Sequence, residues 1–345
     1  MELTGAAPAR REEAYADAAL RERAARAVAA GIAFLERVQL PSGELRILLS
    51  RDDTPAPVPD ACVFGTALVA AALTGVEGTG RIRARAADFL AAQMLPGGVW
   101  RHWTRDSEHF RLGFPPDLDD TAMSSLCLAD QGRAIPPHRP LFLANRDPRG
   151  LFYSWITPRR KWVPIAAFWR IALVQLTHPL SYHGFFTVTP SRRGDVDAVV
   201  NANVLTYLGR SADTEAVVPF LLRIMEEGRE DSCDKWYDNP FAIWYFFSRA
   251  LRGAGADAGG VVLARLRTRT AGDALEHALA ACASLDWGVP PAHGSITAIL
   301  DAQLGSGAWP HVNVYHGDHW RWGAEALTTA YCLEALTRWA GHAGA

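Results

Sequence analysis

An acidic cluster opens an apolar run in the segment Phe114-Pro115-Pro116-Asp117-Leu118-Asp119-Asp120-Thr121-Ala122-Met123. The two prolines stop the preceding chain, and Asp in the first turn of a helix pairs with free backbone N–H groups, so the segment predicts a helix start. A helix cap explains one or two of the acids but not the third. Carboxylates this close repel when ionised, and burial also disfavours their charged form, so one of them can hold a proton near neutral pH. Such an acid, facing an apolar cavity, is suited to protonate an alkene.

The same pattern, a polar cap followed by an alanine-rich apolar run, recurs along the chain. It starts at Asp60, Asp117, Asp195, Asp238, Asp273 and Glu325. More amphipathic helices are expected between these runs, near residues 12–38, 80–94, 212–228, 258–268 and 293–303. A helix that is apolar on all sides is buried, whereas a helix with one apolar face covers it. The alternation predicts an all-α fold, an (α/α)6 barrel whose inner helices bring their acidic N-termini to one mouth.

The expected domain organisation is a single barrel over residues 12–345, preceded by a disordered tail at 1–11. Residues 136–190 break the helical rhythm, with turn residues followed by an aromatic run. Long irregular segments in compact domains are usually functional or mobile. We therefore expect an insertion there that caps the mouth of the barrel.

Composition excludes several classes of protein. The 345 residues are 49% hydrophobic and carry a formal net charge of −2, which gives no basic field for nucleic acid. The longest apolar runs, such as residues 61–73, are too short to span a bilayer, and residues 1–20 lack the order of a signal peptide. The five cysteines are scattered and odd in number, which favours reduced thiols. These features predict a cytoplasmic protein with no transmembrane segment and no nucleic-acid partner.

A second recurrence stands at the ends of the outer helices, where Gln is followed by Gly and, in two of three copies, by Trp. The copies are Gln39 with Gly43, Gln93 with Gly97 and Trp100, and Gln303 with Gly307 and Trp309. Glycine supplies the positive φ that ends a helix, and the glutamine amide can bond freed carbonyl groups.

These two features together resemble the squalene-hopene cyclase and class II terpene cyclase superfamily, whose repeats carry Gln-Gly-Trp turns and whose proton donor lies in an Asp-x-Asp-Asp-Thr-Ala motif. Residues 117–122 match that motif, and the repeats extend the resemblance over about residues 25–340. The resemblance implies a terpene cyclase, an intramolecular isomerase that protonates an isoprenoid alkene or epoxide and cyclises it through carbocations. It also implies that Asp119 is the general acid and that Asp117 and Asp120 tune it.

Size is the departure from this family, because its familiar members build their cavity between two barrels. Three alternatives follow: the insertion closes the cavity, a second subunit closes it in a homodimer, or the chain only binds a prenyl chain without reacting it. A single barrel also resembles the barrel subunit of protein prenyltransferases, which binds isoprenoid diphosphates beside zinc. The spacing of Asp231 and Cys233 fits that site, and His293, His311, His316 and His319 follow. A two-residue match is weak, so we do not expect zinc.

Several further residues are candidates for substrate binding. Aromatic side chains that flank inner-helix starts or lie in the insertion could line the cavity and stabilise a cation: Trp236, Tyr237, Trp320, Trp322, Tyr153 and Trp155. Near another helix start, Asp195, Asp197, Asn201 and Asn203 could hold Mg²⁺, and Arg192 and Arg193 could bind phosphate, if the substrate is a diphosphate. The alternative is an Asp cap, Asn side chains satisfied inside the barrel, and solvated Arg residues.

Overall fold

The computed structural model describes residues 6–53, 56–107, 109–110, 114–159 and 164–342, and it is largely helical, as predicted. Within these ranges, six mostly buried helices contact one another in cyclic order, and the last returns to the first. They are α2 (Val63–Ala72), α4 (Leu118–Asp130), α8 (Ala198–Leu208), α10 (Pro240–Gly253), α12 (Ala274–Leu285) and α14 (Glu325–His342). Every residue of α2 is buried, as expected for a helix that is apolar on all sides.

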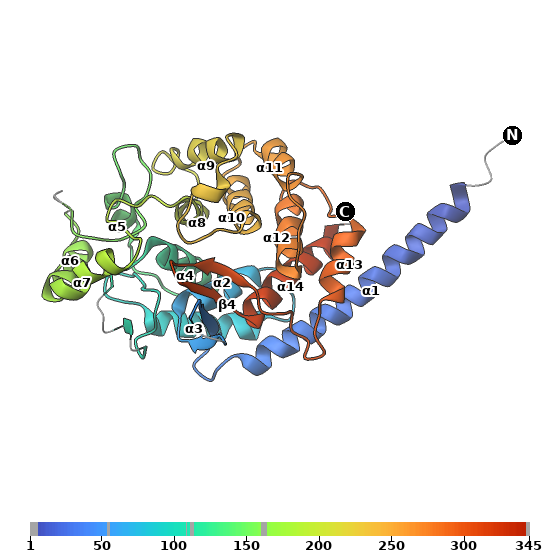
Figure 1. Ribbon diagram of the computed structural model, residues 1–345, viewed down its shortest axis with the longest axis horizontal. Helices are drawn as coiled ribbons and strands as arrows, with labels where there is room; N and C mark the ends of the chain where they lie inside the picture. Colours follow the sequence, from blue (N-terminus) through green and yellow to red (C-terminus); the bar gives the residue numbers. More distant parts are fainter. Residues whose placement is uncertain (1–5, 54–55, 108, 111–113, 160–163, 343–345) are drawn as a thin grey trace.

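A second set of helices lies outside this ring (Figure 1). The set comprises α1 (Ala6–Val38), α3 (Gly80–Gln93), α5 (Arg139–Ala144), α9 (Val217–Glu226), α11 (Gly259–Leu266) and α13 (His293–Asp301). Helix α3 packs on α2 and α4, α9 on α8, α11 on α10 and α12, and α1 on α14. Helix α9 buries Val217, Leu221 and Ile224, which recur at the spacing of one helix face.

Three of the six predicted helix starts, at Asp117, Asp273 and Glu325, lie where the sequence placed them. Asp60 instead ends a short strand, Val58–Asp60, and α2 follows with Cys62 as its N-cap, while Asn239 rather than Asp238 caps α10. Asp117 and Asp273 are the N-caps of α4 and α12, and their side chains accept backbone N–H groups of the first turn. Asp197, rather than Asp195, stands at the N-cap of α8. Helix α1 begins at Ala6, within the segment 1–11 that was predicted as a tail, and residues 1–5 lie outside the described residues.

The prediction of an all-α chain needs one correction, a small antiparallel sheet. It contains β1 (Ile47–Arg51), β2 (Val58–Asp60), β3 (Asn313–His316) and β4 (Trp320–Gly323), in the order β2-β1-β4-β3. Strands β1 and β4 pair with each other although they lie near opposite ends of the sequence, and Leu49 stands opposite Trp322. Strands this short carry little periodic signal, and their pairing depends on the ring of helices bringing distant segments together.

The segment 136–190, predicted to be one insertion, divides into two parts. Its first part belongs to the main body, since Phe142 on α5 and Phe152 are fully buried in the core. The second part forms α6 (Ala166–Thr177) and α7 (Pro179–Val188), which pack on each other and lie at one side of the molecule (Figure 1). The extra element is therefore a helical hairpin, smaller than predicted.

Two of the three recurrent Gln residues tie outer helices to their neighbours, whereas Gln93 accepts the backbone N–H of Arg105 at 2.8 Å. The Gln39 amide donates hydrogen bonds to the carbonyls of Gly43 (3.0 Å) and Ile82 (2.9 Å), and Gln303 bonds Gly307 (3.0 Å) and Ala27 (2.9 Å) in the same way. At Gly307, φ is +88° and an added Cβ would lie 2.4 Å from the carbonyl oxygen of Ala30, so glycine is required there.

Candidate active site

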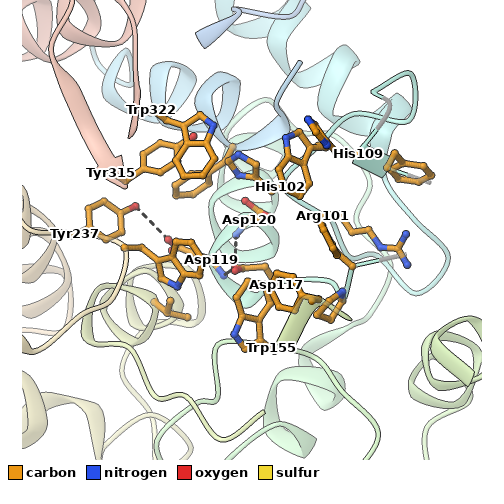
Figure 2. Close-up of a pocket in the computed structure, with 18 residues that line it drawn as sticks. Arg101, His102, His109, Asp117, Asp119, Asp120, Trp155, Tyr237, Tyr315 and Trp322 are labelled. Carbon is orange, nitrogen blue, oxygen red and sulfur yellow. Dashed lines mark hydrogen bonds between the residues drawn. The ribbon is translucent and has the colours of Figure 1, made fainter. Parts of the chain in front are cut away.

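The acid cluster begins helix α4, and Asp117 supplies the cap. Its Oδ1 accepts the backbone N–H groups of Asp119 and of Asp120, the latter at 3.1 Å. This bonding satisfies two of the free donors of the first turn. The side chains of Asp119 and Asp120 are thus left to face other parts of the structure (Figure 2).

Asp119 is held by two hydrogen bonds from distant helical regions. The amide Nδ2 of Asn203 on α8 donates to Oδ1 at 2.7 Å. The hydroxyl of Tyr237, just before α10, donates to Oδ2 at 3.3 Å (Figure 2). The residue is only 6% exposed. Burial raises the pKa of Asp119 to about 7, although both hydrogen bonds favour the carboxylate and oppose that rise. Near neutral pH, both the acid and the carboxylate of Asp119 are therefore populated.

Asp120 differs from Asp119 because one of its oxygens is unsatisfied. The side chain is 3% exposed, and Oδ2 has no hydrogen-bond partner in the described part of the chain. Burial, together with the charges of Asp117 and Asp119, raises the pKa of Asp120 well above its usual range. Burial likewise raises the pKa of Asp117. Burial of a carboxyl group without bonds to its charged form favours the protonated state.

The acids face a pocket with a largely aromatic wall (Figure 2). Residues at or near the starts of α2, α4, α8, α10 and α14 line it, so five of the six inner-helix starts meet at the pocket. The start of α12 does not line it, and of the six acids predicted to begin these helices only Asp117 is in the lining. The aromatic members are Phe64, Trp103, Phe110, Phe114, Trp155, Phe185, Trp236, Tyr237, Tyr315 and Trp322. Tyr315 and Trp322 are stacked, with ring centroids 5.4 Å apart.

Polar groups behind this wall fix the rings in place. The indole N–H groups of Trp322 (2.9 Å) and Trp103 (3.3 Å) both donate to Oδ2 of the buried Asp60. His102 lies edge-on to Trp322, with centroids 5.2 Å apart. Burial lowers the pKa of His102 to about 4, so this imidazole adds no positive charge to the pocket at neutral pH.

Seven of the residues predicted for the site line the pocket, and two predicted aromatic residues do not. The seven are Asp117, Asp119, Asp120, Trp155, Trp236, Tyr237 and Trp322. Trp320 packs edge-on against Trp322, with centroids 5.9 Å apart, and so supports a residue of the wall. Tyr153 is not part of the pocket lining. The guanidinium carbon of Arg159 lies over the Tyr153 ring, 3.5 Å from the ring centroid.

The acidic and amide residues predicted to bind a diphosphate or Mg²⁺ have other partners. Asp195 forms an ion pair with Lys235. Asp197 accepts the hydroxyl of Ser154 at 2.6 Å, and burial raises the pKa of this carboxyl to about 6. Asn201 bonds both backbone groups of Phe152, at 2.8 and 3.0 Å. These contacts agree with the alternative that the acidic and amide side chains at this helix start are satisfied by neighbouring protein groups.

The two predicted arginines also lie outside the pocket lining. Arg192 is exposed. The guanidinium group of Arg193 lies over the ring of Tyr182 on α7, 4.8 Å from its centroid. Neither residue faces the acid cluster, so their placement does not support a role in binding the substrate in this pocket.

The residues considered for a zinc site do not form a cluster, and each has a partner of its own. Asp231 pairs with Arg269 at 2.7 Å, and the thiol of Cys233 donates to the carbonyl of Glu230 at 3.3 Å. The histidines have individual partners: His293 with Asp17, His311 with Asn313, His316 with Asp238 and His319 with Asp52. In the ranges that the structure describes, no group of three His, Cys, Asp or Glu residues is placed to hold a metal ion.

Several pocket residues were not predicted from the sequence. Arg101, His102 and Tyr315 carry no motif, and they reach the pocket from an extended segment before α4 and from strand β3. Asn203 does not line the pocket, and its only signal in the sequence was as a possible Mg²⁺ ligand near a helix start. Its hydrogen bond to Asp119 could not be inferred from that signal.

Comparison with known proteins found no matching family model and no matching curated protein. Solved structures do match, and they give the chain a fold similar to that of type II terpene cyclases. One is a variant of type II terpene cyclase MstE from Scytonema in complex with geranylgeranyl dihydroxybenzoate (substrate): it has 14% identity and a TM-score of 0.69, with 94% of this chain and 99% of that chain covered.

Two further matches agree. Another MstE variant, in complex with merosterolic acid A (product), has 13% identity and a TM-score of 0.70, with 94% of this chain and 99% of that one covered. A protein from Actinoplanes has 19% identity and a TM-score of 0.66, and the match covers 92% of this chain and 99% of that chain. Because these chains are matched almost in full, the length of this chain is sufficient for that fold. None of its described helices is long and apolar enough to cross a membrane.

Proposed function

We propose that the protein is a type II terpene cyclase that protonates an isoprenoid alkene or epoxide and cyclises it through carbocations. One observation carries this proposal: a buried carboxylic acid, Asp119, with a pKa of about 7, lies in the wall of an aromatic pocket. The similar fold of MstE, which binds a geranylgeranyl compound as its substrate, supports a hydrophobic isoprenoid as the ligand.

In this proposal Asp119 is the general acid. Its O–H bond breaks, the proton bonds to one carbon of the alkene, and the π electrons form the new C–H bond and leave a cation on the other carbon. Asn203 and Tyr237 then stabilise the carboxylate that remains, because both donate hydrogen bonds to it. Asp117 holds the helix start, and the raised pKa of Asp120 favours its neutral form, which would not oppose the new carboxylate.

The aromatic wall would act on the cation formed in this step. Ring faces attract positive charge, and a pocket walled by rings also keeps water away from it. Trp322 and Tyr315 present stacked rings to the pocket, and neutral His102 beside them does not repel a cation. Attack by further alkenes forms the rings, and loss of a proton ends the reaction, so the product is an isomer of the substrate.

The finer features of the fold fit the same proposal. We interpret the ring of six helices with its outer set as an (α/α)6 barrel, and residues 117–122 as the acid motif of class II cyclases. Phe185 on α7 lines the pocket and packs against Trp155, with centroids 4.6 Å apart. The α6–α7 hairpin is therefore the proposed element by which a single barrel closes its cavity.

Incubation of the purified protein with isoprenoids of different chain length, including geranylgeranyl dihydroxybenzoate, tests the function. The products are analysed by mass spectrometry and NMR, with and without Mg²⁺, because a diphosphate substrate would require that ion. We expect a cyclic product with the mass of its substrate. Tight binding without turnover of any of these compounds would instead support a protein that only holds a prenyl chain.

A further inference from the structure

Arg101 is a cation at the pocket for which the described part of the chain offers no polar partner. It lines the pocket, and no hydrogen bond or ion pair joins its guanidinium group to another residue of the described ranges. Its one ring contact is with Phe110, whose centroid lies 5.3 Å from the guanidinium carbon. Burial lowers the pKa of Arg101 to about 10, which still leaves it charged at neutral pH.

Two other partly buried arginines of this protein are paired with acids. Arg265 donates to Glu230 at 2.7 Å, and Arg338 bonds Asp286 at 2.5 Å. A partly buried cation with no counter-charge costs free energy, whereas a paired one recovers much of that cost. Arg101 has no such acid among the residues that the structure describes, and a molecule bound in the pocket could supply the missing charge.

Arg101 and the proposed proton donor, Asp119, lie on different sides of the same pocket (Figure 2). Figure 2 shows Arg101 on the opposite side of the pocket from Asp119 and Tyr237. The segment that carries it is fixed, because the neighbouring His102 accepts the N–H of Val63 with its backbone carbonyl at 2.8 Å. A ligand that contacts both residues must therefore place one end at a cation and the other end at a proton donor.

We propose that Arg101 binds a carboxylate head group of the isoprenoid substrate and thereby directs the far end of the chain toward Asp119. This inference rests on the proposed function. A guanidinium group offers two parallel N–H donors that match the two oxygens of a carboxylate, and the single charges balance. A diphosphate carries more negative charge than one guanidinium group neutralises, and Arg192 and Arg193 do not line the pocket.

Binding measurements in the Asp119→Asn background test this proposal without turnover. The probes are geranylgeranyl dihydroxybenzoate, its methyl ester and geranylgeranyl diphosphate, and calorimetry gives each dissociation constant. With Arg101 present, we expect the acid to bind roughly 10- to 100-fold more tightly than the ester, as for a hydrogen-bonded charge pair. Arg101→Leu should make acid and ester equal. Arg193→Leu, a matched loss of an arginine outside the pocket, should leave the preference for the acid intact.

The outcomes separate the two proposals. Equal binding of acid and ester with Arg101 present, or a preference that survives in Arg101→Leu, would overturn the role of Arg101 and leave the cyclase proposal standing. Diphosphate binding tighter than acid binding, and dependent on Arg101, would overturn the assignment of a carboxylate. Failure of all three probes to bind would overturn the carboxylate proposal for Arg101, and the incubations with other chain lengths would then decide the cyclase proposal separately. Circular dichroism checks the fold, and Arg101→Gln replaces Arg101→Leu if that variant unfolds.

Discussion

Replacing Asn203 with Leu should move the pH dependence of catalysis to higher pH. The Asn203 amide donates a 2.7 Å hydrogen bond to Asp119, and this bond favours the carboxylate over the acid. A hydrogen bond to a charged group contributes about 1.5–3 kcal/mol, and about 1.4 kcal/mol corresponds to one unit of pKa. Without the bond, the pKa of Asp119 should therefore rise from about 7 by roughly 1 to 2.

The sign of the effect follows from the role of a general acid, which acts in its protonated form. In the wild type, kcat/KM should be highest below the pKa of Asp119 and should fall about tenfold per pH unit above about 7. In Asn203→Leu, the decline should begin at higher pH. The plateau at low pH should be lower than in the wild type, because the acid is weaker and its carboxylate has lost a donor.

The assay is product formation across the pH range with folded wild type and variant. Tyr237→Phe serves as the graded comparison, because its hydrogen bond to Asp119 is longer, at 3.3 Å, and its loss should raise the pKa less. A folded Asn203→Leu enzyme with the wild-type pH profile would show that Asp119 is not the group that titrates. The assignment of the general acid would then be wrong.

Three further predictions concern the acid, the turns and the hairpin. Asp119→Asn should lower turnover by at least about 10²–10⁴-fold and leave ligand affinity nearly unchanged, since the amide keeps the shape but has no acidic proton to transfer; product assays and calorimetry measure the two effects. Gly307→Ala should lower the free energy of unfolding by about 1–3 kcal/mol in urea titrations, because φ is +88° and the new Cβ would meet Ala30. Residues 166–188 of the α6–α7 hairpin should gain protection from hydrogen exchange when a prenyl ligand binds, since Phe185 faces the pocket.

Each of these predictions has a control or a contrary outcome. Undiminished activity of Asp119→Asn would show that Asp119 is not the general acid and that the motif serves only as an acidic helix cap. Gly305→Ala is the matched control for Gly307→Ala, because no atom lies within 4 Å of its added Cβ, and equal losses of stability in both variants would contradict the turn geometry. Equal protection of the hairpin with and without a bound ligand of measured affinity would contradict ligand-induced closure.

The sequence by itself determined the local features of this protein. The helix starts at Asp117 and Asp273 followed from side-chain caps and apolar periodicity, which act within a few residues. The acid cluster was recognisable for the same reason, since three carboxyl groups within four residues remain close in any fold. Trp236, Tyr237 and Trp322 could be proposed for the pocket wall because parallel inner helices must bring their starts together.

Only the tertiary structure decided which distant side chains meet. The β1–β4 pairing joins segments that lie far apart in the chain, and short strands without strong periodicity do not reveal their partners. Asp195 and Asn201 also stand at an inner-helix start, yet they bond Lys235 and the backbone of Phe152, while Asn203 reaches Asp119. One face of a helix differs from the next by a rotation that sequence spacing does not fix relative to the neighbouring helices. Packing of the whole ring set that rotation, and with it the polar partners of Asp119.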